Sequence, residues 1–270
     1  MSLWNSLRET LIATLRHRRL WLIQFFANLL LMLWVVGIVH MPDSYAWQVI
    51  ASILMIALLV VMVAILQGGT LNYCLETDRN KASALQPPFW NALKHVVPVI
   101  LLMVILYFLY DLIGRLDNYQ YSFPRYLRSE FPAWLRRIVS EPAVRGLYSA
   151  FLTFLRCILL PGLFLPLALL CADRNFRGFF QLRIWLRMLL NLAWWIVVIV
   201  AWFLGIWCVA KLLHWTLDPK TASLHGEQIW LAFRLIVSCL LAIFSWLWVC
   251  TLLARARIKA EAAMEKSPAV

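Results

Sequence analysis

Six apolar runs, each long enough to cross a lipid bilayer, limit what this chain can fold into more than any other feature of its sequence. A spanning helix needs about 20 predominantly apolar residues, because the hydrocarbon core is about 30 Å thick. Hydrophobic residues make up 63% of the chain and charged residues only 14%, a balance that cannot give a soluble surface. We therefore predict an all-α, polytopic six-helix bundle, 20–253, with spans at 20–40, 46–69, 95–114, 147–171, 188–213 and 228–253.

Amphipathic or charged segments flank these spans. Residues 1–19 place apolar side chains at helical spacing, so we expect an interfacial helix on the membrane surface. The connection 115–146 alternates aromatic residues with arginines and predicts short helices on the outer leaflet, with a partner-docking surface as the alternative. Residues 254–270 are predicted to form a basic cytoplasmic tail. The candidate contact residues of the outer connection are Arg125, Arg128, Trp134, Arg136 and Arg137.

The placement of Lys and Arg residues predicts the orientation of the chain. Six spans put both termini on one side of the membrane, and that side carries most of the Lys and Arg residues. By the positive-inside rule we expect both termini in the cytoplasm, at a bacterial inner membrane. The net charge of +12 does not predict nucleic-acid binding, because the basic residues sit at the ends of apolar runs and form no stripe on a polar domain.

A tripeptide recurs where two of the spans end. Asp78, Arg79 and Asn80 follow the second span, and Asp173, Arg174 and Asn175 follow the fourth. Each copy precedes an aromatic-containing amphipathic piece and then another span. This pattern predicts a duplicated hairpin, related by an axis along the membrane normal, as found in some transporters. The alternative is that Asp, Arg and Asn are ordinary turn and capping residues at a helix end.

Three charged residues inside predicted spans are candidates for functional groups. Asp111, Arg156 and Arg234 fall in the outer halves of spans three, four and six, where we expect them to be able to meet. A charge at this depth costs about 2.5–3.5 kcal/mol on insertion scales and by default marks a functional site. In one interpretation the arginines extend toward the outer surface and one pairs with Asp111, holding the spans together. In the other, the cluster binds a phosphate or carboxylate head group.

Sequence patterns for catalysis or cofactor binding are not found. The five histidines lie at span ends or in loops, and the chain holds no His-Glu-x-x-His motif or phosphate-cradling glycine loop. The six cysteines fall inside apolar runs or at their ends without a Cys-x-x-Cys pair, which is typical of small buried hydrophobic residues. We therefore predict no enzymatic activity, no cofactor and no metal site.

Three short motifs carry a resemblance to a known family. They are Gly68-Gly-Thr-Leu-Asn-Tyr73 after the second span, Pro161-Gly-x-x-x-Pro166 in the fourth, and Trp194-Trp195 in the fifth. In these residues the chain resembles the bacterial six-helix membrane domain associated with glycerophosphodiester phosphodiesterases, which also occurs alone in related membrane proteins. The resemblance implies an architecture over most of the chain and no reaction, because no phosphodiesterase catalytic domain is found in this sequence.

We expect an integral membrane scaffold or accessory subunit. Its expected partners are membrane lipids, anionic lipids in particular, together with a protein partner or a second copy of the chain. The alternative is a small transporter or lipid-handling protein that uses the region of Arg156, Arg234 and Asp111. A solvated cavity that reaches Arg156 favours transport, whereas a closed bundle with paired charges favours the scaffold.

Overall fold

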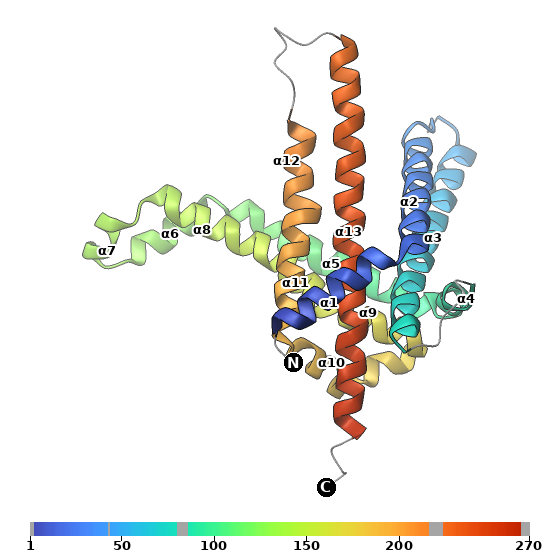
Figure 1. Ribbon diagram of the computed structural model, residues 1–270. Helices are drawn as coiled ribbons and strands as arrows, with labels where there is room; N and C mark the ends of the chain where they lie inside the picture. Colours follow the sequence, from blue (N-terminus) through green and yellow to red (C-terminus); the bar gives the residue numbers. More distant parts are fainter. Residues whose placement is uncertain (1–2, 43, 80–85, 216–223, 266–270) are drawn as a thin grey trace. The chain divides into compact units, whose positions relative to one another are not determined.

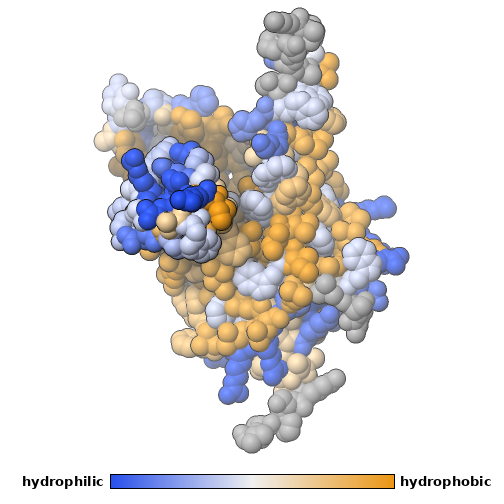
Figure 2. Space-filling model, turned by 90° about the vertical axis from the view of Figure 1, so that its left-hand side faces the viewer, coloured by the Kyte–Doolittle hydropathy of each residue, from blue (hydrophilic) through white to orange (hydrophobic). Residues whose placement is uncertain are grey.

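The computed structural model describes residues 3–42, 44–79, 86–215 and 224–265, and its secondary structure is helical throughout these ranges (Figure 1). Six helices are long and apolar enough to cross a membrane, and they match the six predicted spans one to one. Apolar side chains cover broad areas of the surface between hydrophilic patches (Figure 2), as helices that face lipid require. The predicted six-helix membrane architecture is thus confirmed, with the spans at Arg18–Val39, Ala46–Asp78, Val96–Tyr119, Glu141–Phe180, Leu192–His214 and His225–Met264.

The chain divides into two compact units. Unit 1 comprises Met1–Ile100 and Pro166–Val270, and unit 2 comprises Leu101–Leu165. The chain leaves unit 1 within α5 (Val96–Arg115) and returns to it within α9 (Leu160–Arg174).

Unit 1 is built around α13 (Leu224–Glu265), the longest of its helices. Its neighbours are α1 (Leu3–Arg16), α2 (Arg18–Val39), α3 (Ala46–Asp78), α10 (Leu182–Leu189), α11 (Leu192–Trp202) and α12 (Val209–His214). Figure 1 shows α12 running beside α13 while α1 crosses it. A central stretch of α13 is almost fully buried, so this helix supplies much of the core: Leu247, Cys250, Leu252, Leu253 and Ala254.

A glycine allows the fifth span to approach α13 closely. The π-helical turn η4 (Phe203–Cys208) joins α11 to α12 and packs against α13. A Cβ atom added at Gly205 would lie 3.0 Å from Cβ of Ser245 and 3.1 Å from its Oγ. Small residues at such crossings let two helix backbones come together in a membrane.

The N-terminal segment is helical, as predicted, but one side of α1 is packed into unit 1. Thr10 and Thr14 are fully buried against α13. Thr14 Oγ1 donates to Thr251 Oγ1 at 3.2 Å, and Trp248 Nε1 donates to Thr10 Oγ1 at 3.2 Å. The apolar side chains of Trp4, Ile12 and Leu15 are exposed, so this side remains available for the membrane surface.

The segment predicted as a basic tail is part of the last long helix up to residue 265. Residues up to 265 continue α13 instead of forming a separate tail, and Ala254, Ala256 and Ala260 are buried. Alanine has the highest helix propensity, which favours continuation of the helix beyond the apolar run. Residues 266–270 of the predicted tail lie outside the described ranges.

The first two spans form a helical hairpin with polar contacts inside it. Gln24 of α2 is almost fully buried, and its Nε2 donates to Oγ1 of Thr70 in α3 at 2.6 Å. The short helix α4 (Gln86–Lys94) packs on the last turns of α3, where Gly69 leaves room for the ring of Phe89. These contacts fix the end of α3 that carries the first tripeptide.

Unit 2 contains the predicted short helices of the 115–146 connection. They are α6 (Ser122–Glu130) and α7 (Ala133–Ile138), preceded by η1 (Leu116–Tyr119) and followed by α8 (Glu141–Phe154) and the π-helical turn η2 (Leu155–Leu159). Helix α6 packs on α8, and Tyr148 donates to the carbonyl of Leu116 at 2.9 Å. Short helices are confirmed here, whereas their position on the outer leaflet stays a prediction.

Candidate functional site

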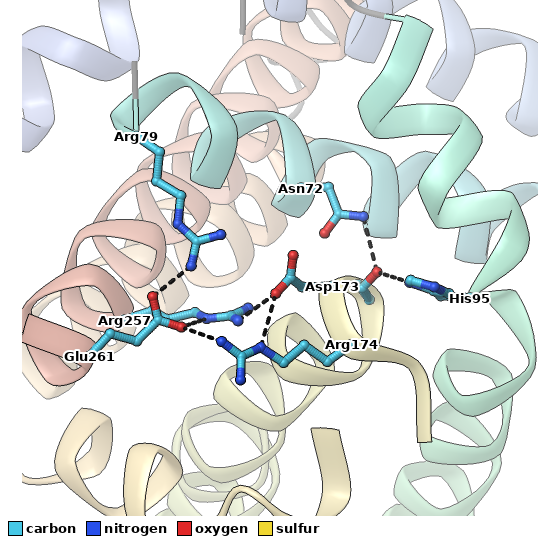
Figure 3. A network of polar contacts seen from close by, with 8 residues as sticks. Asn72, Arg79, His95, Asp173, Arg174, Arg257 and Glu261 are labelled. Atoms are coloured by element: carbon cyan, nitrogen blue, oxygen red, sulfur yellow. Dashed lines mark hydrogen bonds and ion pairs between the residues drawn. The ribbon is translucent and has the colours of Figure 1, made fainter. Parts of the chain in front are cut away.

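The first Asp-Arg pair binds the C-terminal part of α13, and Figure 3 shows its arginine, Arg79, against Glu261. Arg255 Nε lies 3.3 Å from Asp78 Oδ2, and Arg79 Nη2 donates to Glu261 Oε2 at 2.6 Å. The end of α3 is therefore held to α13 by two ion pairs, one in which α3 supplies the carboxylate and one in which it supplies the arginine.

The second Asp-Arg pair binds the same part of α13 in the same sense. Arg257 Nη2 donates to Asp173 Oδ2, and Arg174 Nη2 donates to Glu261 Oε1 at 3.2 Å. Arg257 Nε also donates to Glu261 Oε1 at 3.2 Å. The Glu261 carboxylate thus accepts hydrogen bonds from three arginines, which come from the ends of α3 and α9 and from α13 itself. Together with Glu9 of α1, these residues form what we call the repeat-end network: Glu9, Asp78, Arg79, Asp173, Arg174, Arg255, Arg257 and Glu261.

Burial makes pairing in the repeat-end network necessary. Arg257 is 0% exposed, and a buried charge is costly unless it is paired and hydrogen-bonded. Glu9 of α1 also approaches Arg255, at 3.7 Å. Four arginines therefore face four carboxylates: Arg79, Arg174, Arg255 and Arg257 against Glu9, Asp78, Asp173 and Glu261.

The asparagine of the second tripeptide has a local role. Asn175 adopts a left-handed conformation with φ 57°, and its Oδ1 accepts a hydrogen bond from the backbone N–H of Phe176 at 2.9 Å. Asparagine tolerates this conformation better than most residues, which is why it favours helix ends and turns. Asn80 lies outside the described ranges. In the second copy the Asp and Arg thus make contacts with α13, while the Asn shapes the turn.

The backbone just before Asp173 is held by two side chains from other helices. The carbonyl of Ala172 accepts from Asn72 Nδ2 at 3.1 Å and from His95 Nδ1 at 2.8 Å (Figure 3). A carbonyl can only accept, so in the neutral ring of His95 the proton is assigned to Nδ1. Nε2 is then a hydrogen-bond acceptor. The end of α9 is therefore fixed beside α3 and the start of α5.

His17 lies next to this network. It precedes α2, and its ring meets the ring of Tyr73 edge-on with 5.8 Å between the centroids. Burial lowers the pKa of His17 from its ordinary value; the charge of Asp78 opposes this shift and that of Arg255 adds to it. His17 therefore favours the neutral form in the folded chain.

One interpretation of the sequence paired an intramembrane arginine with Asp111, and Arg156 does not make this pair. Arg156 Nη1 lies 2.7 Å from Asp117 Oδ2, its Nη2 donates to the carbonyl of Ile113 at 2.7 Å, and its guanidinium lies over the ring of Tyr110. Asp111 instead pairs with Arg115 of its own helix at 3.1 Å. An i,i+4 partner is within reach on the same helix face, so Asp111 has a local partner.

Arg234 belongs to unit 1 and binds backbone. It is buried, and its Nη1 donates to the carbonyls of Leu213 at 2.9 Å and Trp215 at 2.6 Å, where α12 ends. The last carbonyls of a helix have no partners within it, and a basic side chain can satisfy them. The three intramembrane candidates thus have three different sets of partners.

The outer-connection candidates are divided between structural and exposed positions. Arg128 donates to the carbonyls of Val139 at 3.1 Å and Arg136 at 3.2 Å, so it holds α6 and α7 together. Trp134, Arg136 and Arg137 have exposed side chains. Arg125 lines a hollow of unit 2 together with Tyr121, Ser122, Tyr126, Ser129 and Glu141.

The residues that α13 contributes to the repeat-end network were not predicted from the sequence. Arg255, Arg257 and Glu261 read as part of a charged tail, although the i,i+4 spacing of Arg257 and Glu261 is a signal for a continuing helix. The paired amide and hydroxyl of Gln24 and Thr70 inside the first two spans were also not predicted.

Chemically, the site holds charged side chains in fixed pairs. In the part of the chain that the structure describes, no group of three or more His, Cys, Asp or Glu side chains is placed to hold a metal ion. Comparison with protein-family models, with curated proteins and with solved structures gives no match to this chain. The resemblance to the phosphodiesterase-associated membrane domain therefore stays a prediction.

Proposed function

We propose that this chain is an integral membrane scaffold or accessory subunit that performs no catalysis and contacts lipid at the membrane surface. The observation that carries the proposal is the repeat-end network. Its charges are balanced internally, and they tie the ends of α3 and α9 to α13. Ion pairs of this kind stabilise one arrangement of helices, which is what a scaffold requires.

The partners of the intramembrane arginines support a scaffold over a transporter. A transporter must exchange the partners of its charged groups for substrate, whereas Arg156 is held by Asp117 and a backbone carbonyl, and its side chain is only 16% exposed. Arg234 is likewise engaged by two carbonyls. Both arginines thus satisfy structural needs within their own units.

The proposed setting is a bacterial inner membrane with both termini in the cytoplasm. The repeat-end network contains residues of α1 and of the last turns of α13, so it lies on the same side as the termini. Partners proposed for the scaffold are membrane lipids and either another protein or a second copy of the chain.

Chemical labelling of Cys157 tests the scaffold against transport. Cys157 directly follows Arg156, so a water-filled path to Arg156 would expose it to a charged, membrane-impermeant methanethiosulfonate reagent. We expect no labelling in open membrane fragments, where the reagent reaches both membrane surfaces, and full labelling after SDS, measured by peptide mass mapping. The Lys259→Cys variant is the accessible control, since Lys259 is exposed at the end of α13. Labelling of Cys157 as fast as that of the control would overturn the proposal in favour of transport.

A further inference from the structure

A hollow of about 520 Å³ lies in unit 1 beside the second repeat turn. It is lined by His95, Asp173, Arg174, Arg177 and Gln181. Three of these residues, His95, Asp173 and Arg174, are seen together in Figure 3. The hollow thus borders the repeat-end network and adds two residues, Arg177 and Gln181, that the network does not use.

The wall of the hollow offers guanidinium groups to an anion. Arg174 uses Nη2 for Glu261 and approaches Asp173 through Nε, and within the described ranges its Nη1 has no partner. Arg177 is exposed, and within the described ranges it has no ion pair. Two guanidinium groups on one wall are well suited to the oxygens of a phosphate.

One residue of the same wall, Gln181, has an acceptor atom without a partner among the described residues. Gln181 Oε1 is buried and has no hydrogen-bond partner. A buried acceptor without a partner is unfavourable, so a ligand is favoured if it donates to this atom when the Gln181 side chain turns toward the hollow. Asp173 lies on the wall too and adds negative charge there. An acceptor and a carboxylate beside two arginines fit a zwitterionic ligand better than a simple anion.

The surroundings of the hollow suit a lipid. Helix α10, which directly follows Gln181, buries Ile184 and Met188 against unit 1. The side chains of Phe180, Leu186 and Leu190 are exposed around it. Exposed apolar side chains next to basic groups are typical of segments that lie at a membrane surface.

We infer that this hollow binds a phosphoethanolamine group, with its phosphate on Arg174 and Arg177 and its primary ammonium on Gln181 Oε1 beside Asp173. The source is either a membrane phospholipid or a soluble phosphoethanolamine ester. The inference rests on the proposed lipid contact only for the lipid source. The Cys157 experiment does not involve the hollow, so failure of one proposal leaves the other standing.

Native mass spectrometry of the unmodified full chain in detergent tests this inference. Phosphatidylethanolamine, phosphatidylcholine and phosphatidylglycerol with the same acyl chains are titrated separately. The choline group has no N–H to donate to Gln181, and the glycerol group has no cation. We expect one site with at least about tenfold tighter binding of phosphatidylethanolamine than of the other two, because only the ethanolamine group carries a charged N–H donor. Equal binding of the ethanolamine and choline lipids would overturn the inference.

Two variants test the phosphate contact and the ammonium contact separately. We expect Arg177→Gln to weaken ethanolamine and choline lipids alike, by about tenfold, and Gln181→Leu to weaken only the ethanolamine lipid. Arg187→Gln is the matched control, because Arg187 is an exposed arginine of α10 that does not line the hollow. An equal effect of Arg177→Gln and Arg187→Gln would indicate general surface charge and overturn the inference. A thermal melt checks that each variant is folded.

A soluble competitor identifies the source of the group. If millimolar glycerophosphoethanolamine displaces the bound lipid, the head group alone is sufficient and a soluble ester is a competent ligand. If it does not, while the preference for the ethanolamine lipid persists, the acyl chains contribute and the ligand is a membrane lipid. Both results support the site and differ only in its source.

Discussion

Replacement of Glu261 by Gln tests whether one shared carboxylate holds the repeat-end network together. In the folded chain this carboxylate accepts from Arg79 at 2.6 Å and from Arg174 and Arg257 at 3.2 Å each. Glutamine keeps the shape of the side chain but removes the charge and one acceptor oxygen. Three arginines would then share the remaining carboxylates of the network.

The magnitude follows from burial. Removing one partner of a fully buried pair costs about 3–5 kcal/mol, whereas an exposed pair contributes about 0–1 kcal/mol. The Glu261 side chain is 21% exposed, Arg79 is 26% exposed and Arg257 is 0% exposed but retains Asp173. We therefore expect the free energy of unfolding to fall by about 2–3 kcal/mol, between these two limits.

Unfolding by SDS in mixed micelles, followed by tryptophan fluorescence, measures this loss. Glu9→Gln is the matched control, because Glu9 is 50% exposed and lies 3.7 Å from Arg255. We expect the control to lose less than about 0.5 kcal/mol. The double variant Arg79→Gln with Glu261→Gln should show a coupling of about 1 kcal/mol. Equal losses for Glu261→Gln and Glu9→Gln would refute the idea that the network stabilises the fold.

Three further predictions use the same unfolding measurement. Arg156→Gln should lose about 1–2 kcal/mol, because it removes both the hydrogen bond to the carbonyl of Ile113 and an ion pair whose carboxylate is half-exposed. Arg115→Gln, at an exposed pair, should lose less than about 0.5 kcal/mol. Gly205→Val should lose about 1–3 kcal/mol by overpacking the crossing with α13, and an unchanged midpoint would contradict the close approach. The pKa of His17 is lower in the folded chain than in the unfolded chain, so as the pH falls the unfolded chain takes up the proton before the folded chain does. The free energy of unfolding should therefore be constant above about pH 6.5 and fall below it. His17→Gln should reduce this fall, and an unchanged pH profile would show that His17 does not cause it.

The sequence was a good guide to the spans and a poor guide to where the helices end. Apolar runs predict the membrane crossings because hydrocarbon tolerates only segments that satisfy their own backbone. Helix α3 continues to Asp78 and α13 to Glu265, well past the predicted span ends at 69 and 253. Hydropathy ends where the membrane ends, whereas a helix continues as long as packing and propensity favour it.

Partners of the charged residues were harder to predict, for a geometric reason. Sequence position gives the depth of a residue in the membrane but not the direction in which its helix faces. Asp111 and Arg156 were placed in the same outer region, yet Arg156 pairs with Asp117, which was assigned to the connection. The repeat residues, by contrast, were found from the sequence, because a recurring motif can be recognised without knowing the direction in which each helix faces.

The contacts of the two repeat copies favour a duplicated hairpin over ordinary turn residues. A turn residue needs no partner beyond its own turn, which accounts for Asn175 but not for the aspartates. Asp78 pairs with Arg255 and Asp173 with Arg257. The arginines of both copies meet at the shared Glu261 carboxylate, so each copy contributes one aspartate and one arginine to the same part of α13. Turn residues that arose independently would each have to acquire an arginine partner on α13, together with a shared glutamate, by coincidence.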